Sequence, residues 1–387
     1  MKKITVKLAT LVLASCSICN TTFGQNDNKI NVVTSAVPFL RISPDARAGG
    51  MGDVGIATSA DASSGFWNLA KTPFAKSKGA VTGTFTPWLR DLGLQDLGLA
   101  TVSGYYKLKE GEAITGSLRY FSLGQITLTD NLGNDLQNVN PRELAFDLGY
   151  SRKLSDKLSV GIAARYIYSN LAGGQSLGGV TYKAGTTVAA DLSVFHKGTN
   201  DRGEGLDYGA VLSNLGGKIS YTNNSQKDFI PANLGIGAAY HKIVDENNKI
   251  TFAMDVNKLL VPTPPAQGDV AGLAAYRDKP VASSWFSSFG DAPGGFAEEM
   301  RELSVSIGAE YSFNDQFFAR AGYFYEDKIK GNRKYITAGV GVRYNTFGLN
   351  FSYIAPSGNG INRNPLSNTL RFGLTFDFDK ATTTPAK

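Results

Sequence analysis

The sequence is poor in the residue types on which most metal and catalytic centres depend. It has only two cysteines and two histidines among 387 residues. His196 and His241 lack the spacing of paired metal ligands, and we interpret both as surface residues. We also find no convincing nucleophile, phosphate-binding loop or cofactor motif. The sequence therefore predicts neither a cofactor, a metal nor an enzymatic activity.

Long hydrophobic runs are absent beyond the N-terminal region. No later stretch approaches the roughly 18 apolar residues of a membrane helix, so we expect no helical membrane span. Residues 1–24 have the features of an export signal, with early lysines, an apolar centre at residues 8–13 and small residues before Gln25. Its removal would take away both Cys16 and Cys19, and with them all thiol chemistry. Residues 13–16 also fit a lipoprotein signal, in which Cys16 would carry lipid.

A strong excess of charge of one sign is missing as well. The net charge of +6 includes three lysines of the export signal, so the mature chain has 36 basic residues against 33 acidic ones. This weak balance speaks against nucleic acid as a partner. Asp201, Glu204 and Asp207 stand close together, but their spacing fits a solvated turn better than a calcium loop.

The chain is rich in segments where apolar residues alternate with polar or small ones. In residues 370–378 the apolar side chains occupy every second position, and Arg371, Gly373, Thr375 and Asp377 lie between them. Successive strand side chains point to opposite faces, so one face is wholly apolar. In an exported chain, a C-terminal strand of this kind is typical of the closing strand of an outer-membrane barrel.

The same rhythm runs through the chain from Gly79 onward. We predict about fourteen strands, joined alternately by tight turns and longer loops, as in outer-membrane barrels with short periplasmic turns. Their centres lie near Thr84, Ser103, Leu118, Leu148, Ala164, Leu192, Val211, Gly237, Met254, Ile307, Ala321, Gly339, Phe351 and Leu374. The predicted fold is an all-β, transmembrane, antiparallel barrel over residues 79–378. A lumen plug at residues 25–78 would precede it, and a tail at residues 379–387 would follow it.

Charged residues in these strands are expected to face the lumen, because charge on the lipid side costs several kcal/mol near the midplane. Short turns place Asp147 opposite Arg165 and Glu310 opposite Arg320. The same parity turns Arg119, Asp191, Asp255, Arg343 and Arg371 inward. We favour a structural network that stiffens the lumen over an ion path, because the charges pair instead of selecting one sign.

Residues 25–78 have no strand pattern. Residues 50–55 formally fit a dinucleotide motif, but no buried strand precedes them and no helical pattern follows. Glycines also allow close backbone packing, which a plug needs, because irregular backbone at membrane depth must be buried in protein or face water. The predicted plug residues are Asp45, Arg47, Gly49, Gly50, Gly52, Asp53, Trp67 and Asn68.

The longest connection, residues 259–300, is rich in proline and aromatic residues. Loops of this length without secondary structure are usually functional or disordered. Its aromatic side chains could fold over the barrel mouth or form an apolar contact with another protein. The candidate protein contact consists of Trp285, Phe286, Phe289 and Phe296.

Residues 46–49, 61–63 and 66–70 resemble the N-terminal hatch of FadL-type outer-membrane barrels. With residues 36–40 and 43–52 added, the segment is similar to the PorV family of the type IX secretion system of Bacteroidetes. Residues 86–89, 104–106 and 117–121 extend the likeness into the first strands. One departure is Leu69, where FadL-type hatches usually have proline, which leaves the local turn open.

The resemblance implies an outer-membrane location in a Gram-negative, Bacteroidetes-like bacterium, and a role without covalent chemistry. It implies binding of the C-terminal signal domains of cargo that has crossed the translocon barrel. The cargo would then pass to a surface attachment complex, where a separate peptidase removes the signal. Membrane lipid and these proteins are the implied partners. The alternatives are a FadL-like transporter of long-chain hydrophobic molecules and a purely structural barrel.

Overall fold

The computed structural model describes residues 32–89, 96–129, 132–177, 180–223, 226–266, 268–355 and 366–379. The predicted export signal, the alternative lipidation site at Cys16 and all of the predicted tail except Asp379 lie outside these residues. The predicted loops near residues 91 and 358 also lie largely outside them.

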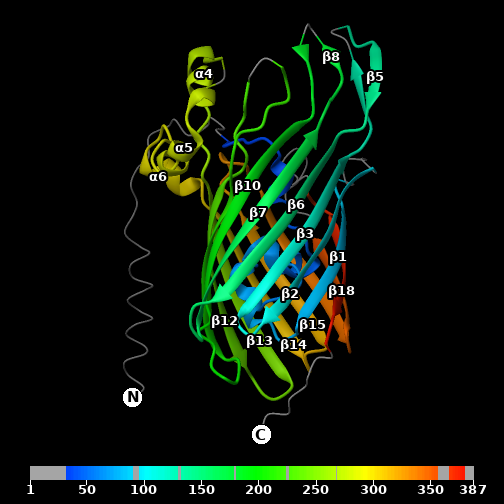
Figure 1. Cartoon of the computed structure of the whole chain (residues 1–387), viewed down its shortest axis with the longest axis vertical. Coiled ribbons are helices and arrows are strands. Elements are labelled where there is room, and N and C mark those ends of the chain that lie inside the picture. Colours follow the sequence, from blue (N-terminus) through cyan, green and yellow to red (C-terminus); the bar gives the residue numbers. More distant parts are fainter. Residues whose placement is uncertain are drawn as a thin grey trace. The chain divides into compact units, whose positions relative to one another are not determined.

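The wall is a closed barrel of fourteen antiparallel strands, as predicted (Figure 1). Each predicted strand centre lies within one wall strand. The wall strands are β1 Gly79–Pro87, β2 Leu97–Lys109, β3 Glu112–Leu123, β6 Arg142–Lys153, β7 Leu158–Asn170, β10 Gly185–His196, β11 Gly205–Gly216, β12 Asn233–Ile243, β13 Asn248–Leu259, β14 Ser304–Phe313, β15 Phe317–Tyr325, β16 Lys334–Tyr344, β17 Phe347–Ile354 and β18 Leu370–Asp377. The ring closes where β1 pairs with β18.

The two ends of the barrel differ in the length of their connections. Tight turns gather at one end, and the other carries two small hairpins, β4 Ile126–Thr129 with β5 Asp135–Val139 and β8 Ser176–Leu177 with β9 Val180–Thr181. Figure 1 shows the hairpins and three helices together at this end. We call it the outer end, because short turns are typical of the periplasmic side.

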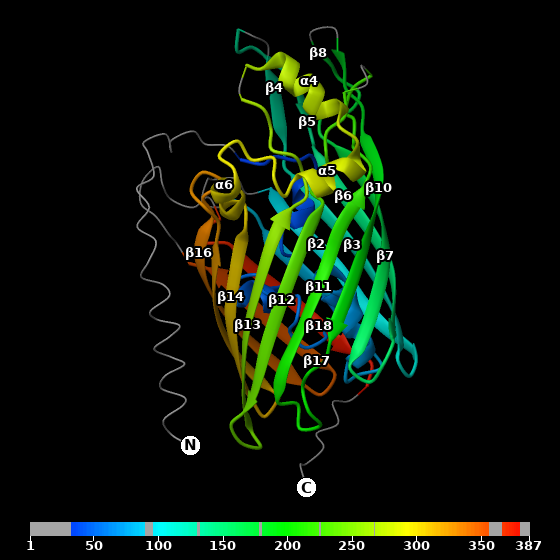
Figure 2. The ribbon, with the colours of Figure 1, turned by 90° about the vertical axis from the view of Figure 1, so that its left-hand side faces the viewer.

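The long connection after β13 is not structureless, and that expectation was wrong. It contains α4 Val270–Asp278, α5 Val281–Ser287 and α6 Phe296–Arg301 (Figure 2). Pro280 precedes the first residue of α5, and Asp269 caps α4 by accepting a hydrogen bond from the amide of Gly272. Such caps let short helices form where proline and glycine interrupt the chain. No helix in the described part of the chain is long and apolar enough to cross a membrane.

The two faces of the wall follow the predicted alternation. In β18, Phe372 and Leu374 are 47% and 54% exposed on the outside, whereas Arg371 is 2% exposed on the inside. An apolar exterior with a polar interior is the pattern of an outer-membrane barrel. The sequence parity thus gives the orientation of the strands correctly.

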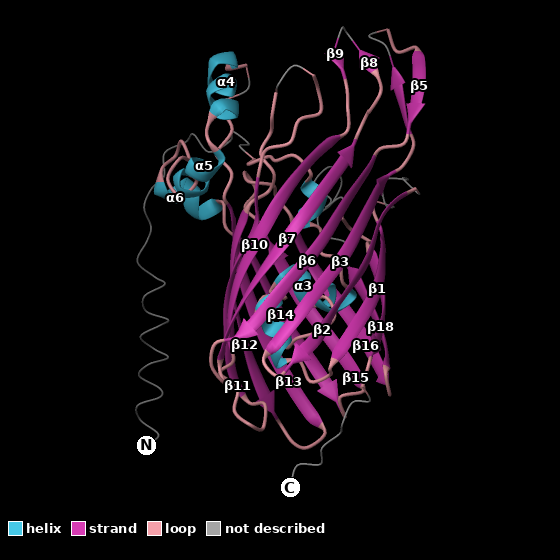
Figure 3. Cartoon of the chain, in the orientation of Figure 1, coloured by secondary structure: helices cyan, strands magenta, loops and turns pink. Residues whose placement is uncertain are grey.

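Four short helical segments occupy the interior. They are η1 Pro38–Arg41, α2 Ala46–Gly50, α3 Ser64–Trp67 and η2 Leu69–Phe74, and α2 contacts β15 to β18 while η2 contacts β3, β6, β7 and β10. Figure 3 shows α3 enclosed by the strands. Met51 and Val54 are fully buried, in one apolar cluster with Phe195 of the wall. We call residues 32–78 the plug.

Candidate functional site

Arg47, in α2 of the plug, forms the most extensive polar connection to the wall. Its Nε and Nη2 donate to the two carboxylate oxygens of Glu310 on β14, at 3.0 and 2.8 Å. Its Nη1 also pairs with Asp61 of the plug at 3.0 Å. Arg320 lies opposite Glu310 in the register and binds the same carboxylate at 2.6 Å. The predicted strand pair therefore exists and also holds the plug, because a forked guanidinium fixes direction as well as distance.

Asp53 connects the plug to the last strand. Arg371 Nη1 donates to Asp53 Oδ1 at 2.7 Å, and the Tyr335 hydroxyl donates to Oδ2 at 2.6 Å. Asp53 has a left-handed backbone with φ of 63°. Few residues other than glycine, asparagine and aspartate adopt this conformation readily. The turn after α2 thus aims the carboxylate at β16 and β18.

The remaining predicted plug side chains hold the plug together. Asp45 caps α2 by accepting from the amide of Ala48 at 2.7 Å, and it accepts from the indole nitrogen of Trp67 at 2.5 Å. Asn68 caps η2 through the amide of Ala70, and its own amide nitrogen donates to the carbonyl of Val194 on β10 at 3.1 Å. These bonds join α2 to α3 and η2 to the wall.

Wall glycines let the plug backbone approach the strands. Gly308 and Gly322 are register partners on β14 and β15, and Met51 lies against both. A Cβ added to Gly322 would lie 2.0 Å from the carbonyl carbon of Met51. A Cβ on Gly50 would lie 3.0 Å from the Cα of Gly339. Side chains at these positions would push the plug out of its seat.

At two further plug positions a side chain would clash with the wall, so glycine is required there. Gly52 has φ of +74°, and a Cβ there would lie 2.6 Å from the amide nitrogen of Tyr323. Its amide donates to the Thr337 hydroxyl at 2.8 Å. A Cβ on Gly49 would lie 2.3 Å from Nη1 of Arg371. These contacts, and not a nucleotide site, account for the glycine-rich run.

Leu69 stands where FadL-type hatches usually have proline. It is 1% exposed and begins η2. Its side chain enters a space left by two wall glycines, because a Cβ on Gly149 or Gly161 would lie 2.8 or 2.7 Å from it. The departure is thus accommodated by the wall.

A second charge network lies across β3, β6, β7 and β10. Asp147 and Arg165 face each other in the register and form an ion pair. Arg119 joins Asp147 at 3.2 Å, and Arg165 joins Asp191 at 2.8 Å. Arg119 also donates to the carbonyl of Leu40 in the plug at 3.3 Å. This network therefore contacts the plug and does more than stiffen the wall.

The sequence predicts that Asp255 faces the lumen but does not predict its hydrogen-bond partner. Its Oδ2 accepts from the amides of Gly55 and Ile56 at 2.7 and 2.9 Å, so it holds the plug turn after α2. Lys71 was missed altogether. It is 1% exposed, its Nζ donates to the carbonyl of Gly55 at 2.5 Å, and burial lowers the pKa of its amine to about 8. The available signal was a lone charge within residues 69–74, which otherwise carry none.

Buried ion pairs fasten the outer helices to the barrel. Lys258, at the end of β13, pairs with Glu299 and Glu302 at 2.8 and 2.6 Å. Lys330 pairs with Glu302 at 3.0 Å. Near α4, Lys218 Nζ donates to the carbonyls of Arg277 and Lys279, at 2.5 and 2.7 Å. A cation at this position also suits the negative end of the helix.

Three of the four aromatic residues predicted as a protein contact lie on the surface. Phe286, Phe289 and Phe296 are 78%, 50% and 77% exposed. Trp285 is half-buried. We call Phe286, Phe289 and Phe296 the aromatic patch; exposed aromatic side chains of this kind are common where proteins bind one another.

The two histidines are partly exposed and partly buried. His196 stacks on Tyr208 with ring centres 4.5 Å apart, and His241 Nε2 lies 3.4 Å from Asp207 Oδ2. In the predicted solvated turn, Glu204 pairs with Lys242 at 2.7 Å. Within the described ranges, no group of three His, Cys, Asp or Glu could hold a metal ion.

Comparison with known proteins gives a family and a fold. The family model described as "Type IX secretion system protein PorV" matches residues 24–266. No curated protein matches the chain.

Among solved structures, the Ralstonia pickettii toluene transporter TbuX is similar at 14% identity, over 88% of this chain and 99% of its own, with a TM-score of 0.51. The CymD monoaromatic hydrocarbon channel is 13% identical over 87% and 98%, with a TM-score of 0.51. A Pseudomonas aeruginosa FadL homologue is 11% identical over 90% and 99%, with a TM-score of 0.46. At such identities the likeness to TbuX and CymD shows the fold alone.

Proposed function

Because this chain belongs to the PorV family of type IX secretion system proteins, we propose that it receives translocated cargo at its outer end. In this proposal it binds the C-terminal signal domain of cargo that leaves the translocon barrel. It then carries the cargo to the surface attachment complex. The chain itself performs no covalent step. The observation that carries the proposal is the family match over the plug and most of the wall.

The plug inside the lumen supports a role at the barrel's outer surface. Arg47, Asp53 and Asn68 of the plug bind wall strands β14, β18 and β10, and Asp255 on β13 binds the plug backbone. The cavity beneath the outer mouth measures about 100 Å³. A folded cargo domain is far larger than this space, so it has to be handled outside the lumen.

The outer helices offer a surface for such handling. The aromatic patch lies on and beside α5 and α6, and buried ion pairs of Lys258 and Lys330 fix α6 at its base. Large aromatic residues on a firmly held support lose little conformational freedom on binding, which favours affinity. We propose that this patch contacts the translocon barrel or the cargo domain.

The test is co-purification of translocon and cargo with the full chain from its native membrane. We expect Phe286→Ser, Phe289→Ser and Phe296→Ser together to reduce recovery about tenfold or more, since truncated hot-spot aromatics cost at least 2 kcal/mol. Adding Trp285→Ser should change little more, because Trp285 is half-buried. The matched control is Val270→Ser with Leu273→Ser on α4, which are 80% and 39% exposed. Unchanged recovery in a heat-modifiable barrel would refute the assignment.

Transport of hydrophobic small molecules is a second candidate. It is favoured by the fold, which this chain shares with the toluene transporter TbuX and the monoaromatic hydrocarbon channel CymD. It requires an apolar path past the plug, but charged and polar groups such as Arg41 and Asn257 line the inner cavity beside apolar ones such as Ile56. Uptake of a labelled fatty acid into vesicles that hold the barrel would support it. A selective loss of proteins with one shared C-terminal domain after gene deletion would favour export.

A further inference from the structure

A hollow in the outer wall lies over the seam where the first strand pairs with the last. It has a volume of about 660 Å³ and extends over β16, β17, β18, β1, β2 and β3, which are neighbours in the barrel. The described residues that line it include no charged side chain. The hollow is on the outside, because its largest side chains belong to the exposed apolar face of the wall.

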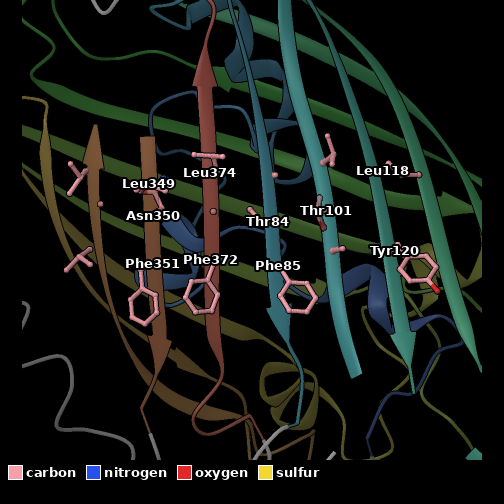
Figure 4. A pocket seen from close by; sticks show the side chains of 17 residues that line it. Thr84, Phe85, Thr101, Leu118, Tyr120, Leu349, Asn350, Phe351, Phe372 and Leu374 are labelled. Atoms are coloured by element: carbon pink, nitrogen blue, oxygen red, sulfur yellow. The ribbon is translucent and has the colours of Figure 1, made fainter. Parts of the chain in front are cut away.

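Two rows of register partners form the hollow. The row nearer the outer end is the more aromatic, and it consists of Val340, Phe351, Phe372, Phe85, Ala100 and Tyr120. Figure 4 shows the rings of Phe351, Phe372, Phe85 and Tyr120 at one level. The rings of Phe351 and Phe372 are in edge contact, with centres 5.3 Å apart.

The second row lies one step nearer the tight turns and is aliphatic. It consists of Val342, Leu349, Leu374, Gly83, Val102 and Leu118. Figure 4 shows Leu349, Leu374 and Leu118 at this level. An aromatic row on the outer-end side of an aliphatic row follows the change from the membrane interface towards the hydrocarbon core.

The floor of the hollow is formed by the two smallest outward residues of the rows, Gly83 on β1 and Ala100 on β2. A Cβ added to Gly83 would meet no atom within 4 Å. Neighbouring strands lie roughly 4.8 Å apart, so a floor on one strand pair is a narrow groove. Leu374 on β18 and Val102 on β2 flank Gly83 in its row, and Phe85 on β1 and Tyr120 on β3 flank Ala100 in the other row.

From this shape and chemistry we propose that the hollow holds an acyl chain of an outer-leaflet membrane lipid. A helix, about 10–12 Å across, is wider than the floor. A partner strand has no edge to join, because every wall strand is already paired on both sides. An extended hydrocarbon chain needs neither a hydrogen bond nor a charge, and it gains by covering apolar surface.

The site also places lipid and plug on opposite sides of the same wall. The Thr84 hydroxyl, which faces inward between Gly83 and Phe85, donates to the carbonyl of Pro44 in the plug. On β18, a Cβ on Gly373 would lie 3.7 Å from that of Ala46 in α2. A bound acyl chain thus supports from outside the seam that the plug supports from inside.

The test uses the full mature chain in phosphatidylethanolamine vesicles that contain a phospholipid with a diazirine in its acyl chain. After irradiation, labelled peptides are mapped by mass spectrometry. We expect the label to concentrate on residues 81–85 and 98–104, roughly fourfold above other outward wall segments, the preference that one additional buried methylene gives. If the label is distributed uniformly around the wall of the unmutated chain, the proposal is wrong, whatever the variants show.

Variants then test the floor itself. Gly83→Leu with Ala100→Leu should fill the groove and reduce labelling there to the level of the remaining wall. The matched control is Ala164→Leu, on the outward face of β7, which should leave the hollow's labelling unchanged. Hollow labelling that persists in the filled, heat-modifiable variant would overturn the proposal. So would crosslinking of these residues in native membranes to a second protein instead of lipid.

Discussion

The plug and the outer helices are both held by buried ion pairs, yet the apolar side chains of the plug are buried and those of the outer helices are exposed. In the plug, Met51 and Val54 are completely buried, whereas Phe286 and Phe296 of the outer segment are more than three-quarters exposed. The difference lies in how each meets the wall. Wall glycines bring the plug backbone against strand backbone, while long lysine side chains hold the outer helices from below. One region is built to close the barrel and the other to present a surface.

The largest expected effect comes from breaking the main plug connection. Arg47→Ala leaves Asp61 without its cation and takes one guanidinium from Glu310, and loss of one partner of a buried pair costs about 3–5 kcal/mol. We expect the plug of this variant to unfold at lower urea concentration, followed by the fluorescence of Trp67 in a background with Trp88→Phe and Trp285→Phe. The control is Arg152→Ala, an exposed residue 3.6 Å from Glu112, with an expected cost of about 0–1 kcal/mol. Equal effects of the two substitutions would mean that Arg47 does not hold the plug.

A smaller effect should follow from crowding the seat of the plug. Gly322→Ala places a methyl group 2.0 Å from the Met51 carbonyl carbon, and overpacking costs about 1–3 kcal/mol. Faster cleavage of the plug by added protease is the readout. Gly348→Ala is the control, because its Cβ would meet only ordinary contacts, the nearest at 3.6 Å. If both variants are cleaved alike, close backbone approach is not what seats the plug.

The smallest effect is expected at the outer helices. Lys218→Ala removes the amine that binds the last carbonyls of α4, an interaction of about 0.3–1 kcal/mol. Hydrogen exchange of the α4 amides should become up to about fivefold faster, and that of the plug should stay the same. Lys183→Ala, at an exposed lysine, serves as the control. Faster exchange in the plug as well would contradict the independence of the two regions.

Strand parity explains why the wall was predictable. Period-two alternation identifies fourteen strands and their inward residues, and a short turn then fixes the register of Asp147 with Arg165 and of Glu310 with Arg320. Neither the alternation nor the hairpin register predicts which plug residue lies against a given inward side chain. The partners of Asp53 and Asp255 were therefore missed, because they come from segments far apart in the sequence.

Short helices and hairpins at the outer end were missed for a different reason. α4 has no buried residue, so no apolar stripe marks it in the sequence. Its ends are set instead by caps and by Lys218, a residue more than fifty positions away. The aromatic residues of the segment were found by composition, but their exposure depends on the helices that carry them.

The ion pair between Asp53 and Arg371 spans 318 residues of sequence. Asp53 precedes every wall strand, and Arg371 belongs to the last one. The pair therefore joins the segment that precedes the wall to the strand that completes it. Two ends of the sequence thus meet at one point of the lumen, where the plug touches the strand that closes the ring.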